Sequence, residues 1–345
     1  MTRAALITGL EGAVLTAAEA QFLRTVRPLG IILFARNCEA AGQIRQLVAD
    51  ALDAIGTDDT LVLIDQEGGR VQRLRPPLGR ALPPAEAYAK RYEAGDGPAA
   101  CAAAAAAAQL VARDLRDLGI NTNCAPVLDL PVAGAHAIIG DRAYGSSVEQ
   151  VIRLGRAVAE GFMSCGVLPV IKHIPGHGRA TKDSHLDLPI VSTPRTELAA
   201  SDFAPFKALA DVPAAMTAHV VFTAIDPDRP ASTSARVTEE FIRGEIGYDG
   251  LLMSDDLGMH ALTGLMRERA EAVIAAGSDV ALHCSGVLAE MEAAASGVPI
   301  LAGDALRRAG VALAVLQQPQ VFDVAAAERL LAEVIAGHGR NSESV

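Results

Sequence analysis

Short apolar runs, rich in β-branched residues, recur along this chain and alternate with longer stretches of helical periodicity. Continuous apolar runs of this kind are typical of strands that are buried on both faces of a parallel sheet. The pattern predicts strands at Ala4–Leu10, Gly30–Phe34, Leu61–Asp65, Ile120–Cys124, Leu168–Lys172, Ala215–Ala218, Leu251–Ser254 and Val280–His283.

Helical periodicity fills the segments between most of these strands. It predicts helices at Glu39–Ala54, Pro98–Leu118, Val148–Cys165, Pro194–Leu209 and Arg267–Ala276, with two more near Asp304–Gln317 and Asp323–Ala336. Strands that alternate with helices place the chain in the α/β class. The number of units favours a single (β/α)8 TIM-type barrel over residues 1–337, with extra C-terminal helices and a flexible tail at 338–345. A doubly wound open sheet is the alternative.

Polar residues stand where the predicted strands end. Asp65 ends the third strand, Lys172 and His173 the fifth, and His219 and Asp255 follow the sixth and seventh. In a barrel of this kind the catalytic groups lie at the C-terminal ends of the strands, so we expect these side chains to share one pocket. An open α/β sheet would gather them in the same way, so the pattern locates the site better than it identifies the fold.

Composition narrows the possible ligands and compartment. A net charge of −11 argues against nucleic acid or an anionic membrane as a partner, and no apolar run approaches the ~20 residues of a membrane span. The apolar stretch after Arg3 is too short for a secretion signal, and five scattered cysteines indicate free thiols in a reducing cytoplasm. Aromatic residues make up only 3% of the chain and Trp is absent, so we expect polar side chains to hold a small ligand.

The densest polar stretch is residues 171–189. Its turn, Pro175–Gly178, excludes a helix, so the spacing of His173 and His177 does not make the helical pair of a zinc site. Asp183 stands two residues before His185, close enough for its carboxylate to orient the imidazole and raise its basicity. The alternative is that both residues only satisfy backbone groups of the loop.

Two further stretches carry candidate chemistry. Asp255 and Asp256 follow the seventh strand, where a carboxylate can be a nucleophile, a base or a metal ligand; the alternative is that they cap the next helix. In the segment 64–73, a Gly68-Gly69 turn lets Asp65 and a returning arginine face one pocket. Arg142, in the loop 140–145, also fits a surface salt bridge. The motifs of phosphate loops and of serine hydrolases are absent.

Taken in order, these stretches resemble the signatures of glycoside hydrolase family 3, in its bacterial β-N-acetylhexosaminidase branch (the NagZ type). The segment Lys172–Gly178 followed by Asp183–Leu186 is the most specific part, and Ile64–Arg73 and Ser254–Met259 are similar to the other two fingerprints. Weaker similarities occur at Gly30–Asn37, Ala125–Asp129 and Ala276–Asp279, so the resemblance covers most of the chain.

The resemblance implies a (β/α)8 barrel and a retaining mechanism without metal or organic cofactor. Asp255 matches the nucleophile of the family, and His185, paired with Asp183, matches its general acid/base. Residues that match positions binding the terminal sugar are Asp65, Arg73, Arg142, Lys172 and His173.

The implied substrate is a muropeptide-type fragment carrying a non-reducing terminal β-linked N-acetylglucosamine on 1,6-anhydro-N-acetylmuramic acid, with or without its peptide. The implied role is cytoplasmic peptidoglycan recycling, by a monomer. Tyr144, where the family more often has Phe, and His283, at a usually more apolar strand end, depart from the pattern. Three alternatives stay open: a phosphorylase that uses phosphate as acceptor, a metal-dependent barrel amidohydrolase built on His173, His177, His185 and Asp255, and a non-catalytic sugar sensor.

Overall fold

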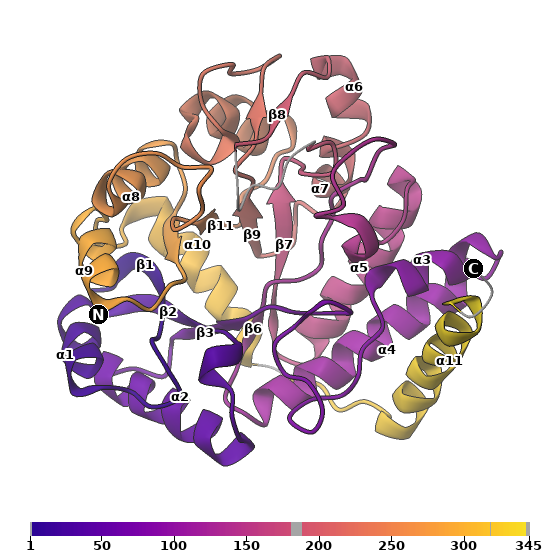
Figure 1. Cartoon of the computed structure of the whole chain (residues 1–345), viewed down its shortest axis with the longest axis horizontal. Helices are drawn as coiled ribbons and strands as arrows, with labels where there is room; N and C mark the ends of the chain where they lie inside the picture. The colour runs from indigo at the N-terminus through magenta and orange to yellow at the C-terminus, as the bar shows by residue number, and fades with distance from the viewer. Residues whose placement is uncertain (1, 181–187, 318, 343–345) are drawn as a thin grey trace.

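The computed structural model describes residues 2–180, 188–317 and 319–342. Its centre is a closed barrel of parallel strands in the order β1-β12-β11-β9-β7-β6-β3-β2 (Figure 1). The strands are β1 (Ala4–Gly9), β2 (Pro28–Leu33), β3 (Leu61–Ile64), β6 (Thr122–Asn123), β7 (Leu168–Ile174), β9 (Ala214–Thr217), β11 (Leu251–Asp256) and β12 (Val280–His283). Each predicted strand overlaps one of them. The barrel prediction is confirmed, and the open sheet is excluded because β1 pairs with both β2 and β12.

Apolar residues on both faces of most barrel strands allow side chains to fill the interior while helices cover the outside. On β1, Ile7 packs in the barrel interior, with Ile32 and Leu63 from neighbouring strands. The adjacent Leu6 packs outward, in a cluster with residues of the surrounding helices. Side chains on a strand alternate between its two faces, so only a strand that is apolar at successive positions can be covered on both sides.

Helices surround the barrel (Figure 1). They are α1 (Ala17–Val26), α2 (Ala41–Ile55), α3 (Ala85–Glu93), α4 (Gly97–Arg116), α5 (Val148–Ser164), α6 (Arg195–Ala200), α7 (Phe203–Ala208), α8 (Met266–Ala275), α9 (Leu288–Ser296), α10 (Gly303–Ala314) and α11 (Val324–Ser342). Short 3-10 helices are η1 (Ala35–Asn37), η2 (Gly140–Arg142), η3 (Ala231–Thr233) and η5 (Val315–Gln317), and η4 (Val237–Glu245) is a π-helix.

The helix predictions need three corrections. The single helix predicted at Pro194–Leu209 is two short helices, α6 and α7, and α1, α3 and α9 were not predicted. Helix α11 continues to Ser342, past the boundary at residue 338 where we predicted the tail to begin. No helix in the described ranges is long and apolar enough to cross a membrane.

The segment leading into α10, and α10 itself, close the barrel end opposite the strand ends that carry the polar residues. Leu301, Ala309 and Ala312, in and before α10, join the interior cluster of the barrel. The backbone N–H of Leu301 donates to the carbonyl of Arg3, just before β1, at 2.8 Å. Helix α11 packs against α3 and α4 on the outside of the barrel. The C-terminal end of the barrel, where the polar residues lie, is not covered by these helices.

Candidate active site

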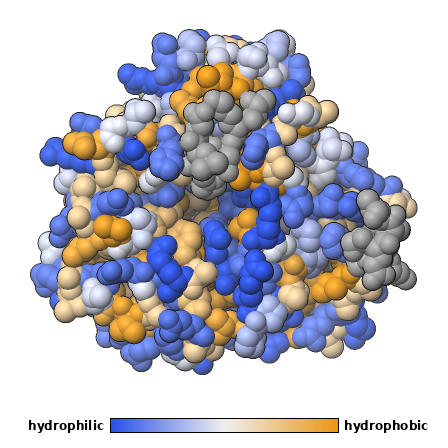
Figure 2. All heavy atoms as spheres, in the orientation of Figure 1, coloured by the Kyte–Doolittle hydropathy of each residue, from blue (hydrophilic) through white to orange (hydrophobic). Residues whose placement is uncertain are grey.

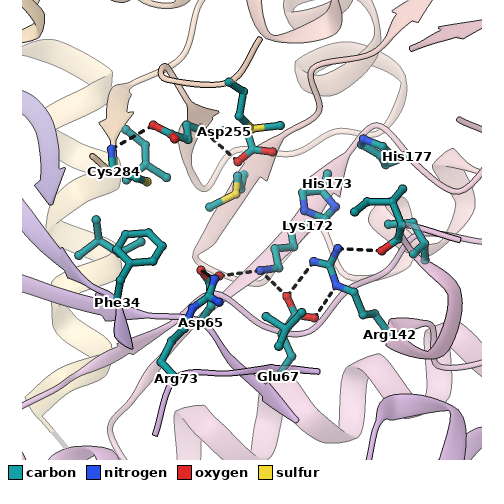
Figure 3. Close-up of a pocket in the computed structure, with 18 of the residues that line it drawn as sticks. Phe34, Asp65, Glu67, Arg73, Arg142, Lys172, His173, His177, Asp255 and Cys284 are labelled. Carbon is teal, nitrogen blue, oxygen red and sulfur yellow. Dashed lines mark hydrogen bonds and ion pairs between the residues drawn. The ribbon is translucent and has the colours of Figure 1, made fainter. Parts of the chain in front are cut away.

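A cavity of about 430 Å³ lies at the C-terminal ends of the barrel strands. Hydrophilic residues gather around the hollow on this face of the molecule (Figure 2). The close-up in Figure 3 shows the side chains that enter it: Phe34, Asp65, Glu67, Arg73, Arg142, Lys172, His173, His177, Asp255 and Cys284. A cavity of this size is suited to a small ligand.

The structure brings together six of the predicted site residues, which come from four separate parts of the chain. All six line this cavity: Asp65, Arg73, Arg142, Lys172, His173 and Asp255. Asp183 and His185, predicted as the acid/base pair, lie outside the described residues.

A tight hairpin after β3 returns the chain to the cavity, as the glycine pair predicted. Strands β4 (Gln66–Gly68) and β5 (Val71–Gln72) pair antiparallel, and Gly68 and Gly69 have φ angles of 107° and 54°. Such positive angles favour glycine because a Cβ atom would be strained there. The hairpin lets Arg73 Nη2 donate to Asp65 Oδ2 at 3.0 Å.

Lys172 is the centre of a charged network on the cavity floor (Figure 3). Its Nζ lies 2.9 Å from Asp65 Oδ1 and 2.7 Å from Glu67 Oε1. Arg142 binds the other side of Glu67 through two hydrogen bonds of 2.8 Å. Arg142 is therefore not part of a surface salt bridge but of a mostly buried one, with side chains 10% and 7% exposed.

This network keeps its members ionised. Burial by itself would raise the pKa of Asp65, but the neighbouring Lys172 and Arg73 outweigh burial and hold that pKa below its usual value. Burial opposes the charge on Lys172 too, yet Asp65 and Glu67 together raise the pKa of its amine. The cavity floor therefore presents fixed charges of both signs, which can donate hydrogen bonds to hydroxyl groups and accept them.

The two neighbouring aspartates of β11 have different partners. Asp256 Oδ1 accepts from the backbone N–H groups of Gly258 and Cys284, each at 3.0 Å, so this carboxylate holds the loops around the cavity. Asp255 accepts from the N–H of Asp256 at 2.8 Å and enters the cavity. The alternative that either aspartate caps the next helix is wrong, because the N-cap residue of α8 is Leu265.

Asp255 carries its charge in a partly enclosed place. Burial would raise the pKa of its carboxyl, but the neighbouring side chains of His173, His219 and Lys172, with the hydrogen bond from the Asp256 N–H, lower the pKa below its usual value. Asp255 is thus an ionised carboxylate facing the space where a ligand fits, which is the state a nucleophile requires.

A buried carboxylate behind the cavity wall contacts His173. Asp129 Oδ2 lies 2.6 Å from His173 Nδ1, and Asp129 Oδ1 accepts from the N–H groups of His173 and His177, at 3.2 and 2.7 Å. The ring of His177 meets that of His173 edge-on, with centroids 5.5 Å apart. Burial, aided by His173, lowers the pKa of His177 to about 4, so this ring is neutral at pH 7.

The sequence prediction missed Glu67 and Asp129 as members of the site. A signal existed for each. Glu67 is two residues after Asp65, and alternate residues of an extended chain point to the same side. Asp129 follows the fourth barrel strand, where the rule about strand ends applies as well. Neither signal identifies the partner of the carboxylate, which is Lys172 for Glu67 and His173 for Asp129.

Of the four residues in the alternative metal site, His185 lies outside the described residues. Across the described ranges, no group of three or more His, Cys, Asp or Glu side chains could hold a metal ion. His219, one of the strand-end residues, is buried with Nδ1 at 2.6 Å from Ser232 Oγ and Nε2 at 3.0 Å from the Asp256 carbonyl. It therefore supports the loop after β11.

The two departures from the family pattern have structural places. Tyr144 is buried, with its ring 6.4 Å from that of Tyr88. His283 is buried at the end of β12, with Nε2 3.0 Å from Ser285 Oγ and 3.3 Å from Glu290 Oε2. Neither Tyr144 nor His283 is among the described residues that line the cavity.

Comparison with known proteins agrees with this geometry. Residues 12–304 match the model of the glycosyl hydrolase family 3 N-terminal domain. The chain is 42% identical over 284 residues to a β-hexosaminidase of Alkalilimnicola ehrlichii, covering 81% of this chain and 80% of that one. It is 40% identical over 283 residues to a β-hexosaminidase of Pseudomonas aeruginosa, covering 81% and 82%.

Solved structures show the same relationship. NagZ from Neisseria gonorrhoeae, in complex with N-trifluoroacetyl-D-glucosamine, superposes with a TM-score of 0.86 at 31% identity, covering 97% of this chain and 98% of that one. A family 3 β-N-acetylglucosaminidase from a Paenibacillus strain gives a TM-score of 0.82 at 30% identity, covering 95% of this chain and 66% of the other.

Proposed function

This chain belongs to glycosyl hydrolase family 3 and is a NagZ-like β-hexosaminidase, and we propose that it removes terminal N-acetylglucosamine from peptidoglycan fragments by a retaining mechanism. The proposed substrate is β-linked N-acetylglucosamine on 1,6-anhydro-N-acetylmuramic acid, with or without peptide. The N-acylglucosamine bound by the gonococcal NagZ supports an aminosugar as the recognised unit. The proposed setting is cell-wall recycling in the cytoplasm, by a monomer without metal or organic cofactor.

The observation that carries this proposal is the position of Asp255. It is an ionised carboxylate in a cavity whose opposite wall holds the network of Lys172, Asp65 and Glu67 (Figure 3). A pyranose seated on that network would offer its hydroxyl groups to fixed charges and its anomeric carbon to Asp255. Sugar binding is accordingly assigned to Asp65, Arg73, Arg142, Lys172 and His173.

The reaction has two displacements at the anomeric carbon C1. First, an Asp255 oxygen forms a bond to C1 while the bond from C1 to the leaving oxygen breaks, and His185 gives that oxygen its proton. Next, His185 takes a proton from water as the water oxygen bonds to C1 and the ester to Asp255 breaks. Asp183 stabilises the imidazolium form that donates the proton. The assignment of His185 and Asp183 rests on the sequence motif.

Trapping the covalent intermediate tests the proposal. A 2-deoxy-2-fluoro or related slow glycosyl donor should label the protein, and mass spectrometry should place the sugar on the peptide containing Asp255. The Asp255→Asn variant, which keeps the shape of the side chain, should stay unlabelled. Label on another residue, or hydrolysis by Asp255→Asn at the wild-type rate, would remove Asp255 from this role.

Analysis of the released product separates hydrolysis from phosphorolysis. Product is analysed from natural or aryl substrates with and without phosphate. A hydrolase releases N-acetylglucosamine under both conditions, whereas a phosphorylase forms the sugar 1-phosphate when phosphate is present.

A further inference from the structure

The mechanism above gives His173 a part in sugar binding but gives none to Asp129, the carboxylate that contacts its ring. The Asp129 side chain is fully buried and is not among the described residues that line the cavity, so it does not touch a ligand there. Its hydrogen bonds within the described residues go to His173 and His177: the His173 ring at 2.6 Å and the two backbone N–H groups at 3.2 and 2.7 Å. A carboxylate with three donors from one segment, 173–177, fixes both the ring and the backbone of that segment.

We propose that Asp129 is a positioning residue that acts on the reaction through His173. It anchors the imidazole by Nδ1, so that Nε2 is the ring nitrogen offered to the bound sugar, and it stabilises a positively charged ring beside Asp255. The inference rests on the function proposed for this site, because it concerns the charge of the proposed nucleophile.

The surroundings of His173 make this charge consequential. Lys172 precedes it on β7, and His177 lies edge-on to it. Asp255 on β11 lines the same cavity, and His219 stands after β9. Of these neighbours, His177 and His219 are neutral at pH 7 because burial lowers the pKa of each ring. A positive charge on His173 would then be compensated by the carboxylates of Asp129 and Asp255.

Replacing Asp129 by Asn tests its contact with His173 without leaving a cavity, because the amide has nearly the same shape as the carboxylate. In Asp129→Asn, the amide oxygen can still accept from the two backbone N–H groups, while its NH2 group faces His173 Nδ1. An NH2 group donates, so Nδ1 becomes an acceptor and the ring is held in the neutral tautomer with its proton on Nε2. The substitution keeps the shape and removes the cation.

The first measurement is kcat/KM against pH with an aryl N-acetyl-β-glucosaminide. Wild type should show an acidic limb that reports ionisation of Asp255 in the free enzyme. In Asp129→Asn we expect kcat/KM to fall on the order of 10- to 100-fold, as when a carboxylate that orients a functional histidine is lost. The acidic limb should move to higher pH by about one unit, because an opposite charge nearby has been removed.

The second measurement asks whether Asp129 acts through His173. His173→Gln should move the acidic limb in the same direction, and the double variant Asp129→Asn/His173→Gln should be no slower than His173→Gln alone. The proposal would be overturned if the losses of kcat/KM in the two single variants multiplied in the double variant. An acidic limb of Asp129→Asn at the same pH as in wild type would also overturn it.

Asp279→Asn is the matched control for loss of a buried carboxylate. Asp279 is also buried and also accepts a backbone N–H, that of Leu252 at 2.9 Å, but it lies at the start of β12, at the other end of the barrel. We expect this variant to lower the melting temperature and leave the acidic limb in place. A shift of the limb in Asp279→Asn would mean that general loosening moves the profile, and this result would also count against the proposal.

Failure of this inference and failure of the proposed function are distinguishable. If wild type does not cleave the aryl glycoside, or if the trapped sugar is not on Asp255, the function is wrong. If wild type cleaves it and is trapped at Asp255 while Asp129→Asn keeps the wild-type profile, only the role of Asp129 is wrong.

Discussion

Four carboxylates around the cavity stay ionised although each is partly or fully removed from solvent. The pKa is below its usual value for all of them, Asp65, Glu67, Asp129 and Asp255. In each case burial alone would raise the pKa, and a neighbouring side chain reverses that effect: chiefly Lys172 for the first two and His173 for the other two. The charges are fixed before a ligand arrives, so little reorganisation is needed when charge develops during the reaction.

A residue-scale prediction concerns His185, the proposed proton donor. In His185→Ala, substrates with poor leaving groups should slow on the order of 10²- to 10⁴-fold, because proton donation to the leaving oxygen supplies about that factor. Activated aryl glycosides need little protonation, so the first step should slow far less for them. The measurement is kcat/KM for a series of aryl glycosides of increasing leaving-group pKa, together with a disaccharide.

The control for this prediction is the melting temperature of the variant, since a partly unfolded enzyme would lose both activities in proportion. An equal loss for good and poor leaving groups, in a protein that melts like wild type, would show that His185 is not the donor.

A site residue could be predicted where its position in the chain pattern defines its role, and not where its role depends on a contact with a distant segment. Asp65, Lys172 and Asp255 were found because strand ends meet at one end of a barrel, which is a property of the chain pattern. Asp129 and Glu67 were missed because their roles consist of contacts. Asp129 lies 44 residues before His173, and Glu67 meets Lys172 only after the barrel closes. No local spacing carries that information.

At the scale of elements, the close contact of α4 and α5 depends on small residues. Helix α4 is rich in alanine, and Gly161 of α5 lies against it. A Cβ added at Gly161 would lie 2.6 Å from the Ala105 carbonyl oxygen and 2.9 Å from the Ala108 Cβ. Two helices can approach this closely only where one presents no side chain.

We therefore expect Gly161→Ala to destabilise the protein by about 1–3 kcal/mol, the usual cost of overpacking a filled interior. Urea denaturation measures it. The matched control is Gly310→Ala in α10, where a Cβ would meet nothing within 4 Å and the position is exposed. Alanine is the better helix former, so this variant should gain up to about 1 kcal/mol. A loss of equal size in both variants would contradict the packing argument.

The errors in predicting elements also have physical causes. The break between α6 and α7 has a sequence signal: Pro205 lacks the N–H that would bond to the Ser201 carbonyl, so a continuous helix is disfavoured there. The missed helices α1, α3 and α9 have only nine or ten residues each. Helices this short are marginal by themselves and obtain their stability from packing, which periodicity does not record.

At the scale of the whole molecule, buried titratable groups couple folding to pH. His177 and His219 have lowered pKa values, so the unfolded chain binds protons there that the folded protein does not. Their contribution to stability is full above the unfolded value of about 6.5 and is lost as the pH falls toward the folded values. The four carboxylates, also with lowered pKa, add stability above about pH 4 that is lost below it.

We accordingly expect the melting temperature to fall in two stages on acidification, first between about pH 6.5 and 4 and then more steeply below about pH 4, by several degrees in each. Calorimetry or circular dichroism across this range measures it. His177→Asn should reduce the upper stage, because only the ring of His219 then contributes to it, and should leave the lower stage in place.

Salt distinguishes these interior groups from charges on the surface. Arg307, with Arg308, lowers the pKa of the exposed Asp249 to about 2, so surface carboxylates have the same sign of pH dependence. At about 0.5 M NaCl the Debye length is only about 4 Å, which screens the exposed pair and affects enclosed groups much less. Both stages should therefore persist in salt, and Asp249→Asn should not alter them there. Loss of both stages in salt would assign the acid sensitivity to the surface and remove the interior charges as its cause.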